Sequence, residues 1–558
     1  IQIVRAAAYN EEAVGKRSIP ATVLAKRGTV TDSKGTVLAE GVLRYNVTVS
    51  PKNARDFTRQ TDRSEVTITP QQAAIEIGSL TGQKPEDILK IIADALAENP
   101  KSDFAYIKKA VDVDTFRALN ALEIPWLFFE AAPGRTYPYG AVAGNLIGYV
   151  GQDGSPQAGL ELAENECLGG TNGEEVYQRG ADGIRIPGST VTNVAAQDGG
   201  SIKLSINADL QWFSQQVLAK RVTETGAQWG IVVVQEVKTG KLITVADYPT
   251  VDPNDVNGSD ESARGSRAFS APYEPGSTIK ALTAAGLINT GAADPNTQVV
   301  APYVINFPNE ARVRDAVPHG AMQLTLTGVL QESSNTGITQ LGQALDAKTR
   351  YDDFRAFGFG ETSAVNFPGE SGGILHPYEE WDNQTTYNTM FGQGLATTAI
   401  QVAGAYQTIG NGGVHLPASL VDECVGPNGD VTKAEVPKGV QVVSPEAART
   451  TVDMLENVVT QGALSKTVQI PGYRSALKTG TAEQSDGNGS YAADYIVSNA
   501  GLIPAEDPRF VVYVVIAYPQ TDSYTACPPV FREVMAQVIK EYRIQPSTSV
   551  SPDLPVRF

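Results

Sequence analysis

The sequence has few of the residues on which metal-dependent and histidine-dependent enzymes rely. Its 558 residues include only three histidines and three cysteines, too few and too scattered for a metal cluster. A metal hydrolase would need a His-Glu-x-x-His motif, which the chain lacks, and a Ser-His-Asp hydrolase would need a well-placed histidine. We therefore expect neither a metal ion nor a cofactor.

Long hydrophobic runs and an excess of positive charge are also absent. No segment approaches the roughly 18 apolar residues that a membrane-spanning helix needs, and the best apolar run, 510–518, has the length of a strand. The formal net charge of -18 argues against nucleic acid and anionic lipid as partners. The chain starts at Ile1 without an initiator Met or a signal-peptide pattern. We therefore expect a processed or truncated chain, with any anchor lost upstream.

The scarcity of cysteine fits a cytosolic protein or an exported bacterial protein. Because the count is odd, at least one thiol is unpaired within the chain. Cys424 with Cys527 is a candidate disulfide. The alternative is three free thiols, with Cys167 as the third.

The composition and the hydrophobic pattern of the sequence change near residue 200 and again near its end. Short β-type runs fill the first 65 residues, helical patterns cover 70–125, and a Gly- and Pro-rich connector, predicted to be extended and loop-heavy, covers 130–200. We expect an N-terminal domain over residues 1–200 and a second domain over 201–543. The Pro/Ser-rich tail, 544–558, is predicted to be frayed.

The second domain combines strands from both of its ends with helices between them. The predicted strands are 202–206, 231–237, 242–246, 476–482, 495–502 and 510–517, and the predicted helices are 209–222, much of 277–408, and 529–542. This order predicts an α+β fold in which one sheet is assembled from both ends of the domain and helices pack on it.

Ser277 and Lys280 form a Ser-x-x-Lys pair at the start of a helical run. Residues three apart on a helix share one face, so the amine can reach the hydroxyl and take its proton. The Pro-Gly turn before Ser277 places it at a helix N-terminus, which favours developing negative charge. A capping serine with a solvated lysine is the competing interpretation. Ser475 and Lys478 have the same spacing but lie in a predicted strand, where such residues face opposite ways.

The segment Lys478-Thr479-Gly480-Thr481 reads as a strand. A glycine inside a strand often marks the close approach of another backbone. We expect a substrate peptide to lie along this edge, with its terminal carboxylate near Lys478 and the hydroxyls of Thr479 and Thr481. A second Lys-Thr-Gly, at Lys238, lies between two strands and is predicted to be an ordinary turn.

Ser333-Ser334-Asn335 follows a helical stretch and completes the set. Ser333 is a candidate proton relay and Asn335 a candidate hydrogen-bonding partner for a substrate amide, although serine and asparagine also cap helices. Ser205-Ile206-Asn207 has the same pattern, but it ends a strand with no nucleophile nearby in sequence. Gly358-Phe359-Gly360 and Gly392-Gln393-Gly394 are predicted to be turns rather than nucleotide-binding loops.

Taken together, the three motifs resemble the acyl-transfer site of β-lactamases and penicillin-binding proteins, and the chain as a whole resembles a class B penicillin-binding protein. The resemblance extends to Arg27-Gly28 with Asp32, Arg135 with Tyr137-Pro138 and Gly140, Gly159-Leu160-Glu161, and Gly392 to Leu395. Phe357 to Gly360 and Pro368-Gly369-Glu370 are more similar to the division-specific subgroup, and Thr225 to Gly230 is similar to actinobacterial members.

The resemblance implies a penicillin-binding transpeptidase fold, an antiparallel sheet flanked by helices, behind an elongated α/β pedestal of the dimerisation type. It implies a peptidoglycan D,D-transpeptidase in which Ser277 is acylated by a stem peptide. Lys280 would be the base, Ser333 and Lys478 would pass the proton on, and Gly480 would lie with its neighbours beside the substrate. Backbone N–H groups of Ser277 and Thr481 would form the oxyanion hole, worth about 3 kcal/mol per donor.

The resemblance also implies partners and a location. Stem peptides would be substrates, β-lactams would acylate Ser277, and no glutamate is placed to hydrolyse that adduct quickly. A membrane glycosyltransferase and other division proteins would be partners at the septum, outside the cytoplasm, with an N-terminal transmembrane anchor absent from this chain. The alternatives are a non-enzymatic scaffold that activates a glycosyltransferase, an elongation-specific transpeptidase, and a β-lactamase or carboxypeptidase.

Overall fold

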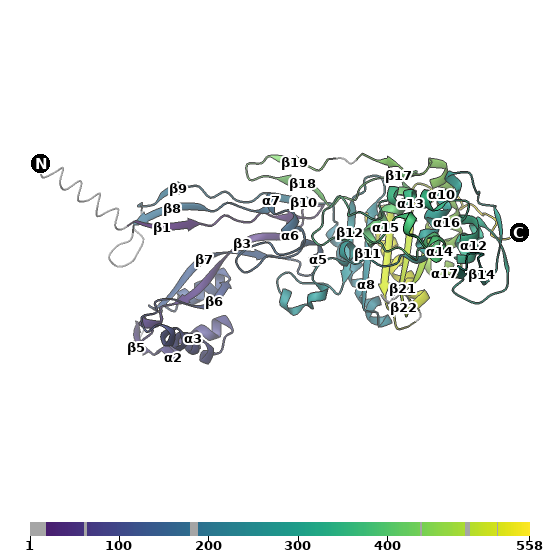
Figure 1. Cartoon of the computed structure of the whole chain (residues 1–558). Helices are drawn as coiled ribbons and strands as arrows, with labels where there is room; N and C mark the ends of the chain where they lie inside the picture. The colour runs from purple at the N-terminus through teal and green to yellow at the C-terminus, as the bar shows by residue number, and fades with distance from the viewer. Residues whose placement is uncertain (1–17, 61–63, 179–187, 436–437, 486–490, 522) are drawn as a thin grey trace.

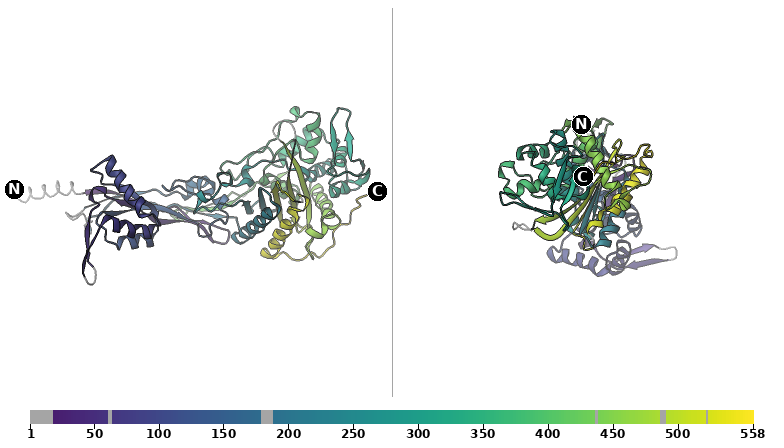
Figure 2. Two further views of the ribbon diagram at one scale, coloured as in Figure 1. Left: turned by 90° about the horizontal axis from the view of Figure 1, so that it is seen from below. Right: turned by 90° about the vertical axis from the view of Figure 1, so that its right-hand side faces the viewer.

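The structure is a computed structural model, and it describes residues 18–60, 64–178, 188–435, 438–485, 491–521 and 523–558. The molecule is elongated, with the early strands and helices at one end and the large second domain at the other (Figures 1 and 2). In the described residues no helix is long and apolar enough to cross a membrane.

A five-stranded sheet forms the centre of the second domain. Its strand order is β12-β11-β23-β22-β21, and every neighbouring pair is antiparallel. The strands are β11 (Trp229–Glu236), β12 (Leu242–Tyr248), β21 (Ala476–Ser485), β22 (Tyr491–Ile503) and β23 (Phe510–Ala517). This confirms the prediction of an antiparallel sheet assembled from both ends of the domain.

The central strand β23 explains why helices cover both faces of the sheet. All its residues are buried, and alternate residues belong to different cores: Val511 and Val515 pack in one, Val512 and Val514 in the other. This alternation follows from the two-residue period of a strand. Helices α8 (Ala208–Thr225) and α18 (Cys527–Glu541) cover one face, and α15 (Ala399–Gly410) packs on the other.

The region between the two halves of the sheet is less helical than its sequence predicts. It contains α10 (Lys280–Asn289), α11 (Leu326–Glu332), α12 (Asn335–Gly342), α13 (Ala347–Ala356) and α14 (Asn383–Asn388). Four short strands interrupt them: β13 (Gln298–Ala301), β14 (Val304–Asn306), β15 (Arg312–Arg314) and β16 (Met322–Thr325). The prediction of a helical stretch from 277 to 408 is therefore wrong over 298–325. These strands exist because β13 pairs with β16 and β14 pairs with β15 in two small two-stranded sheets, which a single-segment pattern does not reveal.

The pedestal contains a second sheet around the long strand β3 (Val37–Val49), which pairs with β6 (Ala105–Val111) and β7 (Leu127–Thr136). Helices α2 (Pro70–Thr81), α3 (Pro85–Glu98) and α4 (Val113–Asn120) share a core with this sheet. The prediction of helices throughout 70–125 is therefore wrong at β6, which is a strand because it pairs with β3. The connector over 130–200 is more ordered than expected, with β7, α5 (Gly144–Ile147), α6 (Gly159–Ala163), α7 (Asn165–Leu168), β8 (Gly173–Gln178) and β9 (Val191–Val194).

Three separate segments of the pedestal meet at the buried carboxylate of Glu161. Arg27 Nε lies 2.5 Å from one of its oxygens and Arg135 Nε lies 2.6 Å from the other. The hydroxyl of Tyr137 donates to the Arg135-bonded oxygen over 3.3 Å. A buried carboxylate needs such partners because it has lost its water. The N-terminal residues that carried the family resemblance thus form one charge network.

One strand pair of the second domain reaches back to the pedestal. Strands β18 (Val421–Val425) and β19 (Val431–Lys433) form an arm that pairs with β10 (Ser201–Leu204), and β10 pairs in turn with β2 (Val30–Thr31). A disulfide joins Cys424 in the arm to Cys167 in α7.

The predicted pair Cys424–Cys527 and the alternative of three free thiols are therefore both wrong. Cys527 is the free cysteine; it is buried in α18, and its thiol donates to the carbonyl of Val497 over 3.3 Å.

The C-terminal tail packs against the second domain, so the prediction that it is frayed is wrong. Asn457 Nδ2 donates to the carbonyl of Leu554 over 2.8 Å, and Thr325 Oγ1 donates to that of Pro555 over 2.6 Å. The backbone of Arg557 pairs with that of Leu324. These long-range contacts supply the order that the composition of the tail does not.

Candidate active site

Ser277 and Lys280 lie on one face of a short helical turn. Ser277 is in the 3-10 helix η4 (Gly276–Ile279), and Lys280 is the first residue of α10. Side chains three residues apart nearly eclipse each other in a 3-10 helix. Lys280 Nζ donates to Ser277 Oγ over 2.9 Å. This confirms the prediction that the two side chains share one face, although the turn that carries Ser277 is a 3-10 helix.

The turn that carries Ser277 is fixed by close backbone packing. Gly276 has φ +60°, and a Cβ there would lie 2.9 Å from that of Ala482 on β21, so only glycine fits without a shift. Thr278 Oγ1 donates to the carbonyl of Pro275 over 3.0 Å, and the hydroxyl of Tyr406 donates to the carbonyl of Thr278 over 2.8 Å. The buried helix α15 thus helps to hold this turn in place through Tyr406.

Ser333 connects the two lysines. It is the C-cap of α11 with φ 56°, an unusual backbone conformation for a residue other than glycine and one that clusters at functional sites. Lys280 Nζ donates to the carbonyl of Ser333 over 2.5 Å and lies 3.3 Å from its hydroxyl. Lys478 Nζ donates to the same hydroxyl over 2.9 Å. Ser277, Lys280, Ser333 and Lys478 therefore form one continuous polar chain.

Burial makes both lysines weaker bases than free amines. Both side chains are fully buried. Loss of hydration lowers the pKa of Lys280 to about 7, while the negative charge of Asp315 acts in the opposite direction. Burial and the neighbouring charge of Lys280 hold the pKa of Lys478 well below its usual range. An amine with a pKa near 7 can accept a proton at neutral pH.

Asn335 is the first residue of α12 and lies at the edge of the site. Its side-chain amide donates to the carbonyl of Arg314 over 2.8 Å. The cap of this helix is Ser334, whose hydroxyl accepts from the N–H of Gly337 over 2.9 Å. The competing interpretation of the motif as a helix cap thus applies to Ser334, and it leaves Ser333 and Asn335 available for other roles.

Asp315 organises this motif, and our sequence analysis missed it. The carboxylate is largely buried and lies beside the N-terminus of α12, where an anion is favoured. It accepts hydrogen bonds from the N–H of Asn335 (2.5 Å), the N–H of Thr336 (3.0 Å), the hydroxyl of Ser334 (2.8 Å) and Nε2 of His319 (2.9 Å). No local pattern marks Asp315, because it is 20 residues from Asn335 in sequence and only the fold brings them together.

Strand β21 forms the opposite wall of the site, and it pairs only with β22 among the described strands. A Cβ on Gly480 would lie 2.4 Å from Ser498 Oγ and 3.0 Å from the carbonyl oxygen of Pro275. The close approach that the glycine predicted is therefore confirmed, but the approaching backbone is the one that precedes Ser277. No described strand pairs with the other edge of β21, so this edge can accept an added strand.

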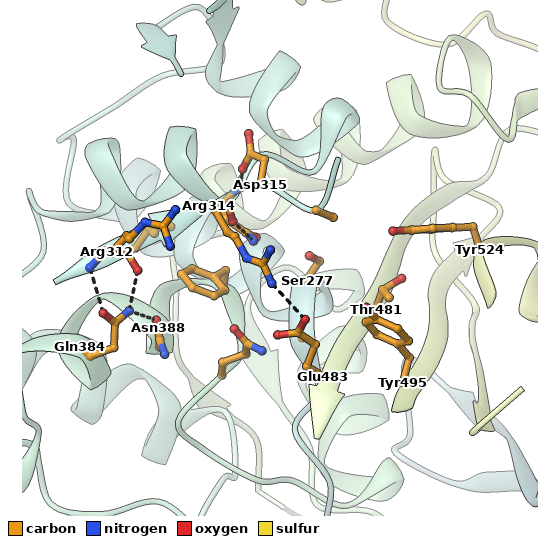
Figure 3. A pocket seen from close by; sticks show the side chains of 16 residues that line it. Ser277, Arg312, Arg314, Asp315, Gln384, Asn388, Thr481, Glu483, Tyr495 and Tyr524 are labelled. Atoms are coloured by element: carbon orange, nitrogen blue, oxygen red, sulfur yellow. Dashed lines mark hydrogen bonds and ion pairs between the residues drawn. The ribbon is translucent and has the colours of Figure 1, made fainter. Parts of the chain in front are cut away.

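A cleft with two lobes surrounds Ser277, and six residues line both lobes: Ser277, Asp315, Ala316, Asn335, Thr481 and Tyr524. The charged lobe has a volume of about 360 Å³ and includes Arg312, Arg314, Gln384, Asn388, Glu483 and Tyr495 (Figure 3). The apolar lobe has a volume of about 460 Å³ and includes Val317, Met322, Val458, Leu464, Thr479 and Val497.

The duplicate motifs have structural roles elsewhere. The hydroxyl of Ser205 donates to the carbonyls of Leu242 and Leu420 over 2.7 Å and 3.2 Å. Lys238 lies in the turn between β11 and β12. A Gly-x-Ser-x-Gly string at 369–373 lies in irregular chain rather than between a strand and a helix, so it does not form the nucleophile turn of an α/β-hydrolase. Among the described residues no cluster of His, Cys, Asp and Glu could hold a metal ion.

Comparison with known protein families gives two matches that together span most of the chain. Residues 230–536 match the family described as "Penicillin binding protein transpeptidase domain". Residues 22–204 match the "Penicillin-binding Protein dimerisation domain".

Known proteins similar to this chain match it over nearly its whole length. "Penicillin-binding protein PbpB" of Mycolicibacterium smegmatis is 33% identical over 585 residues, which cover 99% of this chain and 89% of the relative. "Peptidoglycan D,D-transpeptidase FtsI" of Escherichia coli is 30% identical, covering 95% and 86%.

Two solved structures have a similar fold. A peptidoglycan synthetase from Bifidobacterium adolescentis has a TM-score of 0.75 at 29% identity, covering 97% of this chain and 100% of that structure. Penicillin-binding protein 3 of Mycobacterium tuberculosis, complexed with aztreonam, has a TM-score of 0.73 at 26% identity, covering 96% and 100%.

Proposed function

This chain belongs to the penicillin-binding proteins that carry a transpeptidase domain, and from this premise we propose that Ser277 is the nucleophile with which it cross-links peptidoglycan. The chain is a division-type peptidoglycan D,D-transpeptidase. The observation that supports the assignment of Ser277 is the 2.9 Å hydrogen bond from Lys280 Nζ to its hydroxyl, at an amine whose pKa is about 7.

In the acylation step, the oxygen of Ser277 attacks the carbonyl carbon between the two terminal D-Ala residues of a donor stem peptide. Neutral Lys280 takes the hydroxyl proton as the new C–O bond forms. Backbone N–H groups of Ser277 and Thr481 stabilise the negative charge on the carbonyl oxygen. The C–N bond then breaks, and the leaving D-Ala takes a proton that reaches it through Ser333 and Lys478.

In the second step, an amine from an acceptor stem peptide attacks the acyl-enzyme. A new amide bond forms, Ser277 leaves as its hydroxyl, and Lys280 returns to its starting state. A β-lactam follows only the first step. Glu483, which lines the charged lobe, is paired with Arg314 over 3.3 Å and is not a free base. We therefore expect the adduct to be hydrolysed slowly.

The placement of Lys478 supports the proposed direction of the donor. Its amine is held by Ser333 and by the carbonyl of Thr479, each at 2.9 Å, so an N–H donor group lies where β21 enters the cleft. A terminal carboxylate is expected at this end, with Thr479 and Thr481 as hydrogen-bond donors. Gly480 keeps the strand close to Ser277.

We also propose the domain boundaries, the location and the protein partners of the chain. Residues 1–200 would form the pedestal, 201–543 the transpeptidase domain and 544–558 the tail. The protein would act outside the cytoplasm at the septum, held to the membrane by a segment upstream of this chain. A membrane glycosyltransferase and other division proteins would contact the pedestal.

The test is intact-mass spectrometry with benzylpenicillin. We expect one covalent adduct on the peptide that holds Ser277, and none on Ser277→Ala with unchanged thermal unfolding. An adduct that persists in Ser277→Ala would refute the assignment. Acylation without cross-linking of donor and acceptor peptides would favour the scaffold function, and release of free D-Ala alone would favour a carboxypeptidase.

A further inference from the structure

The charged lobe lies on the side of Ser277 that the body of the donor peptide must occupy. Thr479, Thr481 and Glu483 alternate along β21, so their side chains share one face at steps of about 7 Å. With the donor's terminal carboxylate at Thr479 and its reacting carbonyl at Thr481, the residue before D-Ala-D-Ala lies beside Glu483. This placement rests on the proposed function.

Two arginines of β15 line the charged lobe together with Glu483. In β15, Arg312 and Arg314 are exposed and the intervening Val313 is buried, so both arginines point to the same side. Arg314 Nη2 lies 3.3 Å from Glu483 Oε1, which bridges the two walls of the cleft in front of Ser277 (Figure 3). In the described part of the chain, the guanidinium of Arg312 makes neither an ion pair nor a hydrogen bond, although its backbone bonds Gln384.

The ion pair is of a kind that a ligand can replace. The side chains of Arg314 and Glu483 are 57% and 30% exposed, and exposed pairs contribute little net stability because water competes for both charges. Opening the pair would present one carboxylate and two guanidinium groups inside a single lobe. Such a lobe matches a side chain that carries both an ammonium and a carboxylate.

The chemistry of cross-linking supplies a substrate of this kind. The acceptor stem must carry a free amine, and donor and acceptor stems have the same composition, so the donor carries that amine too. We propose that the charged lobe recognises the residue before D-Ala-D-Ala and selects a diamino acid whose side chain ends in both a free ammonium and a free carboxylate. Glu483 receives the ammonium, and Arg312 and Arg314 receive the carboxylate.

The test compares three acyl donors that end in X-D-Ala-D-lactate. X is 2,6-diaminopimelate, its side-chain carboxamide, or lysine. Ser277 displaces lactate in each case, and a D-amino acid serves as acceptor. We expect kcat/KM to be at least about tenfold higher for the first donor than for the other two. Arg312→Gln, Arg314→Gln and Glu483→Gln should each reduce that preference.

A matched control removes a charge outside the cleft. Lys241 forms a partly exposed ion pair with Asp422 over 2.9 Å, so Lys241→Gln should keep the preference for the zwitterionic donor. Because Lys241 lies outside the cleft, Lys241→Gln should also be acylated by benzylpenicillin within about twofold of the rate of the unmodified protein. For the three cleft variants the readout is the ratio of kcat/KM between donors, which does not depend on how much each variant slows acylation as a whole. If the depsipeptides react too slowly, competition of the corresponding D-Ala-D-Ala peptides against benzylpenicillin gives the same ranking.

The outcomes distinguish the specificity of the charged lobe from the proposed function of Ser277. If benzylpenicillin acylates Ser277 but the three donors react equally, or lysine reacts fastest, the inference about the charged lobe is overturned and the proposed function stands. If the unmodified protein forms no adduct at Ser277, the proposed function itself fails. A preference that survives Glu483→Gln and both arginine variants would also overturn the inference.

Discussion

Lys478 donates a hydrogen bond to the hydroxyl of Ser333 over 2.9 Å, across 145 residues of sequence. The same hydroxyl lies 3.3 Å from the amine of Lys280, so two buried amines meet at one small side chain. Two ammonium groups at this separation repel strongly where water is excluded. The arrangement therefore favours a neutral amine close to neutral pH, which is the state that Lys280 needs in order to act as a base.

The first prediction concerns the pH dependence of acylation. Below its pKa of about 7, Lys280 carries a proton and cannot accept another from Ser277; above it, the amine is neutral. The rate of acylation by a β-lactam should therefore rise with pH, with a midpoint near 7, and then level off. Stopped-flow or rapid-quench mass spectrometry from pH 5.5 to 9 measures this rate. A rate that is flat or falling between pH 6 and 8 would count against Lys280 as the base.

The second prediction concerns Asp315→Asn. Asparagine would replace one acceptor oxygen with an NH2 group, which cannot accept the hydrogen bonds that the N–H and O–H groups now donate to the carboxylate. We therefore expect a loss of about 2–4 kcal/mol in the free energy of unfolding and much slower acylation. The negative charge that raises the pKa of Lys280 would also be gone, so the midpoint of the residual pH profile should move to lower pH. Chemical denaturation and the acylation assay measure the two effects.

A control variant for Asp315→Asn is available at the start of another helix. Asp346 caps α13 by accepting from the N–H of Thr349 over 2.7 Å. Asp346→Asn should cost at most about 1 kcal/mol, because asparagine is also a good N-cap, and it should leave the pH profile in place. A profile for Asp315→Asn that moves to higher pH would contradict the electrostatic argument.

The sequence predicted the central sheet and the main reactive groups because each depends on local signals. Strands β11, β12 and β23 have clear apolar runs, and the small and apolar neighbours of Lys478-Thr479-Gly480 indicate β21. The spacing of Ser277 and Lys280 defines a shared helical face whatever lies around it. Asp315 escaped prediction because its role depends on contacts with a helix that starts 20 residues later. The cysteine pairing failed for the same reason, since 257 residues separate Cys167 from Cys424.

The third prediction concerns Gly480→Ala. The added methyl group would meet Ser498 Oγ at 2.4 Å and the carbonyl oxygen of Pro275 at 3.0 Å, so β21 and the turn that carries Ser277 must move apart. We expect acylation to slow by at least about tenfold while the fold remains intact. Gly320→Ala, where a methyl group meets open space, is the control and should acylate normally. Normal acylation of Gly480→Ala would show that the contact is less restrictive than its geometry indicates.

The last prediction concerns the bridge between the arm and the pedestal. Under denaturing conditions, alkylation should modify one thiol per chain without reductant and three after reduction, because Cys527 is free and Cys167 pairs with Cys424. Cys167→Ser, Cys424→Ser and the double variant should each lose about 2–4 kcal/mol. The double variant should lose no more than either single one, because both changes remove the same bond.

In these variants, proteolysis should cut the arm, β18 and β19, more readily than in the unmodified protein. The rate of acylation should stay within about twofold, because neither Cys167 nor Cys424 lines the cleft. Three reactive thiols in the unreduced protein, or additive losses in the double variant, would show that the arm is held to the pedestal by strand pairing alone.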